Sequence, residues 1–148
     1  QVTQQAREED IERVRAAYAA SGIAADVATF FKDLPARMAA AHLVIGRAGA
    51  STVAELTVIG RPGLLVPLPH ALDNDQLNNA RRLAESGGGW CIEQKDLSPA
   101  RLASEIERLV AAPQALAAAA EAAKRAGRPD AVVRLADFAL QMAAHGRG

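Results

Sequence analysis

Short apolar runs alternate with helical stretches through most of the chain, and the connections between them are short. Four runs have the length and composition of buried strands, at residues 26–31, 42–46, 63–68 and 90–93. Periodicity and capping signals predict helices at residues 6–20, from 34, 52–59, 75–86, from 99, 114–126 and 130–144. Parallel strands need such crossover helices, so the alternation predicts an α/β fold, a Rossmann-like parallel sheet with helices on both faces.

Length and charge narrow the possible functions. The 148 residues amount to about one domain, and 17 basic residues balance 17 acidic ones. This balance, with only 3% aromatic residues, gives no footprint for nucleic-acid binding. No apolar run reaches the roughly 20 residues of a membrane span. The sequence lacks an initiator Met and enters just before a helical pattern, so we expect a piece of a longer protein; a processed N-terminus is the alternative.

The single cysteine excludes folds that are held together by internal disulfides or by cysteine-bound zinc. Cys91 is the single cysteine and lies in an expected strand, so the chain has no internal disulfide or zinc framework. We expect neither a metal nor another cofactor.

The turn after the expected strand 42–46 is rich in glycine. Ligands of open parallel α/β sheets bind at the carboxyl ends of strands, and this turn lies at such an end. Gly49 and Ala50 would let backbone N–H groups approach a ligand closely. Ser51 follows, and a helix expected from Thr52 would add free N–H groups and the positive end of its dipole.

These features suit a phosphate or a diphosphate. Arg47 either offsets the charge of such a ligand or pairs with a surface carboxylate. The alternative for the whole motif is that the turn needs glycine for its own geometry.

Glu55 also has two interpretations. A carboxylate one turn inside the helix can accept hydrogen bonds from the vicinal hydroxyls of a ribose. The spacing of Thr52 and Glu55 equally fits a capping box, in which the two residues satisfy each other's backbone N–H groups.

The loop after the expected strand 63–68 is unusually polar. Asp75 and Asn79 share a helix face and Gln76 lies beside them, which offers the donors and acceptors that sugar hydroxyls need. Helix capping is the alternative, and Asp73 and Asn74 already provide it. For His70 a solvated side chain and a catalytic role both stay open.

Four motifs together resemble one enzyme family. The segments GRAGASTVAEL, GRPGLLVPLP, DNDQLNNA and RPDAVVRLADF occur in order over roughly residues 28–138. This set is similar to the C-terminal domain of the MurG family, the UDP-N-acetylglucosamine transferases of peptidoglycan synthesis. The resemblance implies the donor-binding half of a GT-B glycosyltransferase, with residues 1–148 forming one partial C-terminal domain that includes the helices at 114–145.

The resemblance also assigns the donor site. It implies that the backbone of Phe31 meets the uracil and that Glu55 binds the ribose. It places Ala50, Ser51 and Thr52 near the diphosphate and Gln76 and Asn79 at the N-acetylglucosamine, and Asp75 falls where relatives can carry another polar contact. Arg47 and Gly49 complete the candidate site from the residues alone.

The implied enzyme transfers N-acetylglucosamine from UDP-N-acetylglucosamine to lipid I, forming lipid II, at the cytoplasmic face of the bacterial membrane. The acceptor site, the membrane-facing surface and the general base belong to the family's N-terminal domain, and the family's first phosphate-binding turn also precedes residue 1. We therefore expect no catalytic residue in this chain and no activity from it alone. The alternatives are another GT-B glycosyltransferase with a different sugar or acceptor and a non-catalytic module that binds nucleotide sugars.

Overall fold

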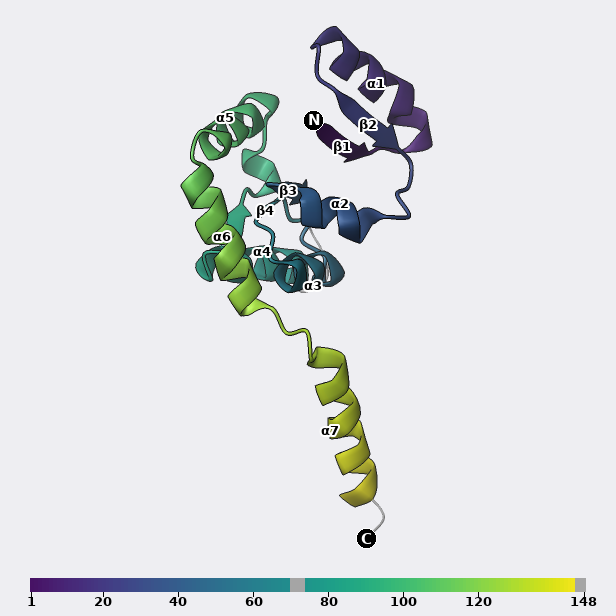
Figure 1. Cartoon of the computed structure of the whole chain (residues 1–148), viewed down its shortest axis with the longest axis vertical. Coiled ribbons are helices and arrows are strands. Elements are labelled where there is room, and N and C mark those ends of the chain that lie inside the picture. Colours follow the sequence, from purple (N-terminus) through teal and green to yellow (C-terminus); the bar gives the residue numbers. More distant parts are fainter. Residues whose placement is uncertain (70–73, 146–148) are drawn as a thin grey trace. The chain divides into compact units, whose positions relative to one another are not determined.

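The computed structural model describes residues 1–69 and 74–145, with side chains described as far as residue 143. Contacts divide the chain into two units, residues 1–40 and 41–148. Each unit is an arrangement of parallel strands and helices and is described by itself (Figure 1).

The 1–40 unit is built around one parallel strand pair. Strand β1 (Val2–Gln5) pairs with β2 (Ala25–Ala28), and the 3₁₀ helix η1 (Glu8–Asp10) and helix α1 (Ile11–Ala20) form the crossover between them. Helix α2 (Leu34–Ala40) follows β2. The sequence did not predict β1, because Val2 is the single apolar residue of this strand. In the structure its four residues alternate between half-buried and exposed.

The 41–148 unit contains a three-stranded parallel sheet of order β3–β4–β5. Its strands are β3 (Val44–Gly46), β4 (Gly63–Leu65) and β5 (Gly89–Cys91). The connecting and following elements are α3 (Ala50–Ile59), α4 (Asp75–Glu85), η3 (Gln94–Asp96), α5 (Pro99–Val110), α6 (Pro113–Ala126) and α7 (Ala131–His145). All three strands were predicted from their apolar runs, and each is shorter than its run.

Both faces of β4 are buried, as expected for the central strand of such a sheet. On one face Leu64 packs in a cluster with Ile92 and with Leu109 of α5. On the other face Gly63 lies against Leu56 of α3 and Leu83 of α4. Helices thus cover both faces of this sheet, as the alternating pattern predicted.

Glycine allows β4 and β5 to approach these helices. Gly63 pairs with Gly89, and a Cβ on Gly89 would lie 2.3 Å from the Gly63 carbonyl oxygen. A Cβ on Gly63 would lie 2.9 Å from the Leu56 side chain. Gly87, with φ +78°, follows α4, whereas Gly89 belongs to β5.

Helix α7 differs from the other helices of its unit because its described side chains are exposed. The exposed apolar residues among them are Val132, Val133, Leu135, Phe138, Leu140 and Met142. Helix α5 shows the more usual division, with a buried apolar stripe and an exposed charged side.

Two adjacent residues of α5 test this description of the core. Leu109 is 0% exposed and Val110 is 64% exposed. Leu109→Ala should lower the free energy of unfolding by roughly 2–5 kcal/mol because it leaves a cavity. Val110→Ala, the matched control, should change that free energy by less than about 0.5 kcal/mol. Urea unfolding of both variants measures the difference, and equal losses would contradict the assigned core.

Candidate functional site

The carboxyl ends of β3, β4 and β5 lie at one edge of the sheet, because the three strands are parallel. Residues 47–49, 66–74 and 92–98 leave these ends and lead into α3, α4 and α5. Most of the residues singled out from the sequence lie in these connections or in the first turns of the helices that follow.

Hydrogen bonds link the connections to one another. Arg47 Nη1 donates to the Val66 carbonyl at 3.2 Å and to the Pro67 carbonyl at 3.4 Å. Asn79 Nδ2 donates to the Ala48 carbonyl at 3.2 Å, which ties α4 to the glycine turn. The structure therefore brings the glycine turn and the start of α4 together.

The glycines of the turn are not required by the backbone. Neither Gly46 nor Gly49 has a positive φ, and Gly49 has φ −60° and ψ 150°. A Cβ on Gly46 would meet nothing within 4 Å among the described residues, and one on Gly49 would meet only Thr52 Oγ1 at 4.0 Å. Neither a positive φ nor close packing among the described residues requires these glycines, although Gly49 also serves as the N-cap of α3, a position that glycine favours.

The N-terminus of α3 is uncapped by side chains. The helix begins at Ala50 with Gly49 as N-cap, two residues earlier than predicted, and no side chain caps it. The first intrahelical bond of this turn runs from Val53 N–H to the Gly49 carbonyl. The N–H groups of Ala50, Ser51 and Thr52 therefore have no hydrogen-bond partner among residues 1–69 and 74–143, and free N–H groups at a helix N-terminus are suited to binding an anion.

The capping box predicted as one role for Glu55 does not form. Thr52 is the third residue of α3 rather than its N-cap, so Glu55 lies in the second turn. Glu55 is exposed, and no hydrogen bond or ion pair joins it to the rest of the described chain. It follows Ser51 by four residues, so the two side chains share one face of α3.

The amide side chains of α4 are partly engaged by the protein. Gln76 Oε1 accepts a hydrogen bond from the Leu68 N–H at 3.0 Å, while Asn79 binds Ala48 as described. Gln76 Nε2 and Asn79 Oδ1 have no protein partner within the described part of the chain, so they remain available to a ligand. Asp75 is the exposed first residue of α4.

The structure describes one of the two residues predicted to cap α4. Asn74 is the N-cap residue, with φ 56°, but its side chain makes no capping hydrogen bond. Asp73 and His70 lie outside the described residues.

Gln94 is the contact of Arg47 that sequence reasoning missed. Arg47 Nη1 donates to Gln94 Oε1 at 2.7 Å, the shortest of its three contacts. The two residues are 47 positions apart, and no local pattern indicates the contact. The predicted pairing of Arg47 with a surface carboxylate is not observed among the described residues.

Two further groups follow β5. The ammonium of Lys95 at 3.1 Å and the guanidinium of Arg81 at 2.9 Å hold the pKa of Glu93 below its ordinary value. Burial raises the pKa of the Cys91 thiol, which is therefore protonated near neutral pH.

Phe31 belongs to the 1–40 unit, so it is described apart from the other site residues. Its ring is buried beneath the Arg37 guanidinium, whose Cζ lies 4.3 Å from the ring centroid. Arg37 in turn forms ion pairs with Asp26 and Asp33. These contacts fix the ring and leave the role predicted for the Phe31 backbone untested.

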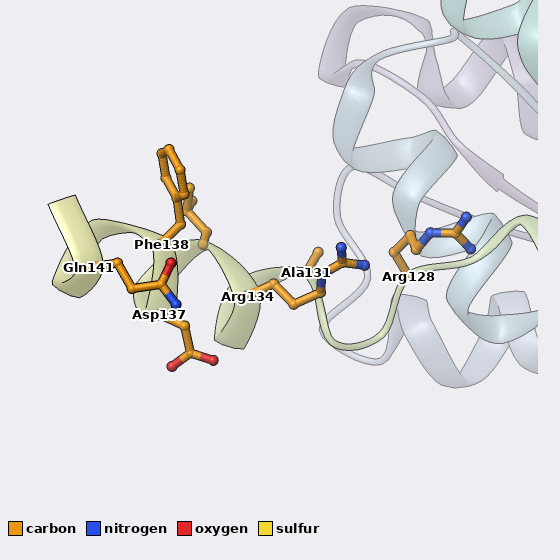
Figure 2. Close-up of a pocket in the computed structure, with 7 residues that line it drawn as sticks. Arg128, Ala131, Arg134, Asp137, Phe138 and Gln141 are labelled. Carbon is orange, nitrogen blue, oxygen red and sulfur yellow. The ribbon is translucent and has the colours of Figure 1, made fainter.

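A hollow of about 660 Å³ lies along α7 and not at the strand ends. Figure 2 shows Asp137 and Phe138 projecting from different sides of α7, with Arg134 and Arg128 nearer its start. This hollow is an open groove on an exposed helix, so we base no ligand assignment on it. Within the described residues, no three His, Cys, Asp or Glu side chains cluster closely enough to hold a metal ion, and no helix is long and apolar enough to cross a membrane.

A glycine turn and an uncapped helix N-terminus at the carboxyl edge of a parallel sheet are typical of nucleotide-binding α/β domains. The family model described as "Glycosyltransferase family 28 C-terminal domain" matches residues 1–135. The chain belongs to this family. The match confirms the fold class and the kind of enzyme that the motifs indicated.

Curated relatives carry one descriptive name, UDP-N-acetylglucosamine--N-acetylmuramyl-(pentapeptide) pyrophosphoryl-undecaprenol N-acetylglucosamine transferase. The relative from Brucella anthropi is 57% identical over 143 residues, which are 97% of this chain and 38% of the relative. The one from Methylobacterium sp. (strain 4-46) is 58% identical over 96% of this chain and 38% of the relative. The chain thus spans about 38% of the length of these relatives.

Solved structures agree with this family. A crystal structure of Acinetobacter baumannii MurG matches with a TM-score of 0.84 and 29% identity, over 92% of this chain and 41% of that one. The glycosyltransferase VinC, solved in complex with DTDP, matches with a TM-score of 0.66 and 25% identity, over 83% of this chain and 29% of that one.

The absence of a capping box makes a prediction about stability. Glu55→Ala should leave the free energy of unfolding within about 0.5 kcal/mol of the parent value, because the carboxylate contacts nothing in the described chain. Ser98→Ala is the matched control, since the Ser98 side chain accepts from the Arg101 N–H at 3.1 Å and caps α5. Its loss should cost about 1 kcal/mol. Thermal or urea unfolding measures both, and a loss for Glu55→Ala equal to that for Ser98→Ala would restore a capping role.

Proposed function

We propose that this chain is the donor-binding part of an enzyme that transfers N-acetylglucosamine from UDP-N-acetylglucosamine to lipid I, producing lipid II. One observation carries the proposal: Gly49, which has no positive φ and open space for a Cβ among the described residues, directly precedes a helix N-terminus whose first N–H groups have no partner among those residues. A side chain at this position would stand where a diphosphate must approach the backbone. The names of the curated relatives supply the donor and the acceptor.

The parts of the donor take successive places along the sheet edge. The diphosphate accepts hydrogen bonds from the N–H groups of Ser51 and Thr52 and interacts with the positive end of the α3 dipole. The ribose hydroxyls donate to the Glu55 carboxylate, one turn further along α3. The N-acetylglucosamine meets the unpaired amide atoms of Gln76 and Asn79 and the exposed carboxylate of Asp75.

The chemistry requires stabilisation of a leaving group. A hydroxyl of the acceptor attacks the anomeric carbon of the donor, and the bond from that carbon to the β-phosphate oxygen breaks. The departing oxygen keeps the electron pair, so negative charge develops on UDP. Fixed N–H groups at the start of α3 stabilise this charge in the transition state. The proton of the attacking hydroxyl goes to a base elsewhere in the full-length protein, and we assign no catalytic residue here.

The acceptor determines where the enzyme works. An undecaprenol chain keeps lipid I in the membrane, whereas the donor is water-soluble. We therefore place the full-length enzyme at the cytoplasmic surface of the bacterial membrane, with this part of the chain holding the soluble substrate.

Gly49→Ser tests the carrying observation. Serine is a favoured N-cap residue, so this change should preserve or slightly raise the free energy of unfolding. Its side chain should nevertheless obstruct the diphosphate and weaken UDP binding by the full-length protein about tenfold, equivalent to roughly 1.4 kcal/mol. Calorimetric titration with UDP and assays with a lipid I analogue measure the effect. Unchanged UDP binding in a folded Gly49→Ser variant would contradict the proposed diphosphate site.

If Glu55 binds the ribose, the protein should prefer a UDP-sugar to a deoxythymidine-diphosphate sugar, which another GT-B enzyme would use as its donor. Wild-type protein should bind UDP about tenfold more tightly than 2′-deoxy-UDP, because the missing hydroxyl leaves one carboxylate oxygen unpaired. In Glu55→Ala the two ligands should bind equally well, both more weakly than UDP binds the wild type. A preference for UDP that persists in Glu55→Ala would remove Glu55 from the ribose site.

A further inference from the structure

One nitrogen of Arg47 connects the ends of all three strands in the 41–148 unit. Arg47 follows β3, its carbonyl acceptors Val66 and Pro67 follow β4, and Gln94 follows β5. The Gln94 contact, at 2.7 Å, is the shortest of the three. Gln94 Oε1 is thus the best-placed acceptor for Nη1. The Val66 and Pro67 carbonyls share the second hydrogen of Nη1.

This arrangement engages only part of the guanidinium. The group is planar and carries five N–H donors in a fixed fork, so holding Nη1 also sets the direction of the other donors. Nη2 and Nε have no hydrogen-bond partner among the residues that the structure describes. Such a pair of donors is suited to bidentate binding of phosphate oxygens.

The backbone that carries Gln94 is itself fixed. Glu93 immediately precedes it and forms ion pairs with Arg81 of α4 at 2.9 Å and with Lys95 at 3.1 Å. Because Glu93 is the N-cap residue of η3, these contacts hold the start of that 3₁₀ helix against α4. Gln94 thus follows a residue that is tied to α4, and its solvent-exposed side chain accepts a hydrogen bond from the solvent-exposed Arg47.

We propose that Gln94 is a positioning residue for donor binding: it orients the Arg47 guanidinium so that Nη2 and Nε bind the diphosphate, without touching the donor itself. This inference rests on the proposed function, since it assumes a nucleoside diphosphate at the strand ends. It adds a residue that lies outside all four sequence motifs and acts only through Arg47.

The test compares ligands with and without phosphate. In the full-length protein, Gln94→Ala should weaken UDP binding about tenfold, the size expected for loss of one charge-assisted contact, while uridine binding stays within about twofold. Asp96→Ala, in the same 3₁₀ helix, is the matched control and should bind both ligands like the wild type. Calorimetry for UDP and competition measurements for uridine provide the values.

A second variant, Arg47→Met, tests whether Gln94 acts on UDP binding through Arg47. Arg47→Met keeps the aliphatic stem and removes the guanidinium, so adding Gln94→Ala to it should change UDP binding no further. Equal weakening of UDP and uridine by Gln94→Ala, or an additive effect in the Arg47→Met background, would overturn the positioning role. So would UDP binding by Gln94→Ala that matches the Asp96→Ala control. If Arg47→Met does not fold, the comparison of UDP with uridine decides alone. A wild-type protein that binds no UDP would instead contradict the proposed function.

Discussion

The parallel pairing of β4 with β3 and β5 decides where the functional groups of the 41–148 unit can lie. Parallel strands place their carboxyl ends at one edge, so the three connections that leave them converge there. The pairing depends on close packing around Gly63 and Gly89, where a Cβ on Gly89 would collide with the Gly63 carbonyl. A side chain at either position would separate β4 from β5 or from its helices and would move the edge on which the site is built.

The site itself shows the opposite use of glycine. Gly63 and Gly89 are enclosed by neighbouring atoms, whereas Gly46 and Gly49 face open space in the described structure. Beside Gly49, the first N–H groups of α3 and the Glu55 carboxylate have no partner in the described chain. Their hydrogen bonds are therefore available to a ligand without breaking contacts that hold the fold together.

Sequence patterns predicted the parts of this fold that arise from local chemistry. Apolar runs identified β3, β4 and β5, and Ser98-Pro99 identified the start of α5, because burial and capping leave local signals. The same signals failed for β1, whose pairing with β2 is what makes Val2–Gln5 a strand. They also placed the start of α3 two residues late, since Gly49 serves as N-cap without a side chain.

The candidate site was only partly predictable for a related reason. The motifs identified Arg47, Glu55, Gln76 and Asn79, and the structure ties Arg47, Gln76 and Asn79 into one network at the sheet edge. Gln94 could not be found, because its contact with Arg47 depends on the β3–β4–β5 order and joins residues 47 positions apart. Nor could the sequence exclude a capping box between Thr52 and Glu55, which required the observed start of α3 at Ala50.

The central claim is that a nucleoside diphosphate sugar binds at the carboxyl edge of β3–β4–β5 with its diphosphate against the start of α3. A crystal structure of the full-length protein with UDP-N-acetylglucosamine tests it most directly. The account predicts diphosphate oxygens within about 3 Å of the Ser51 and Thr52 nitrogens, a normal N–H···O distance, and ribose hydroxyls on Glu55. A donor whose diphosphate lies away from the start of α3, with Glu55 still facing solvent, would contradict it.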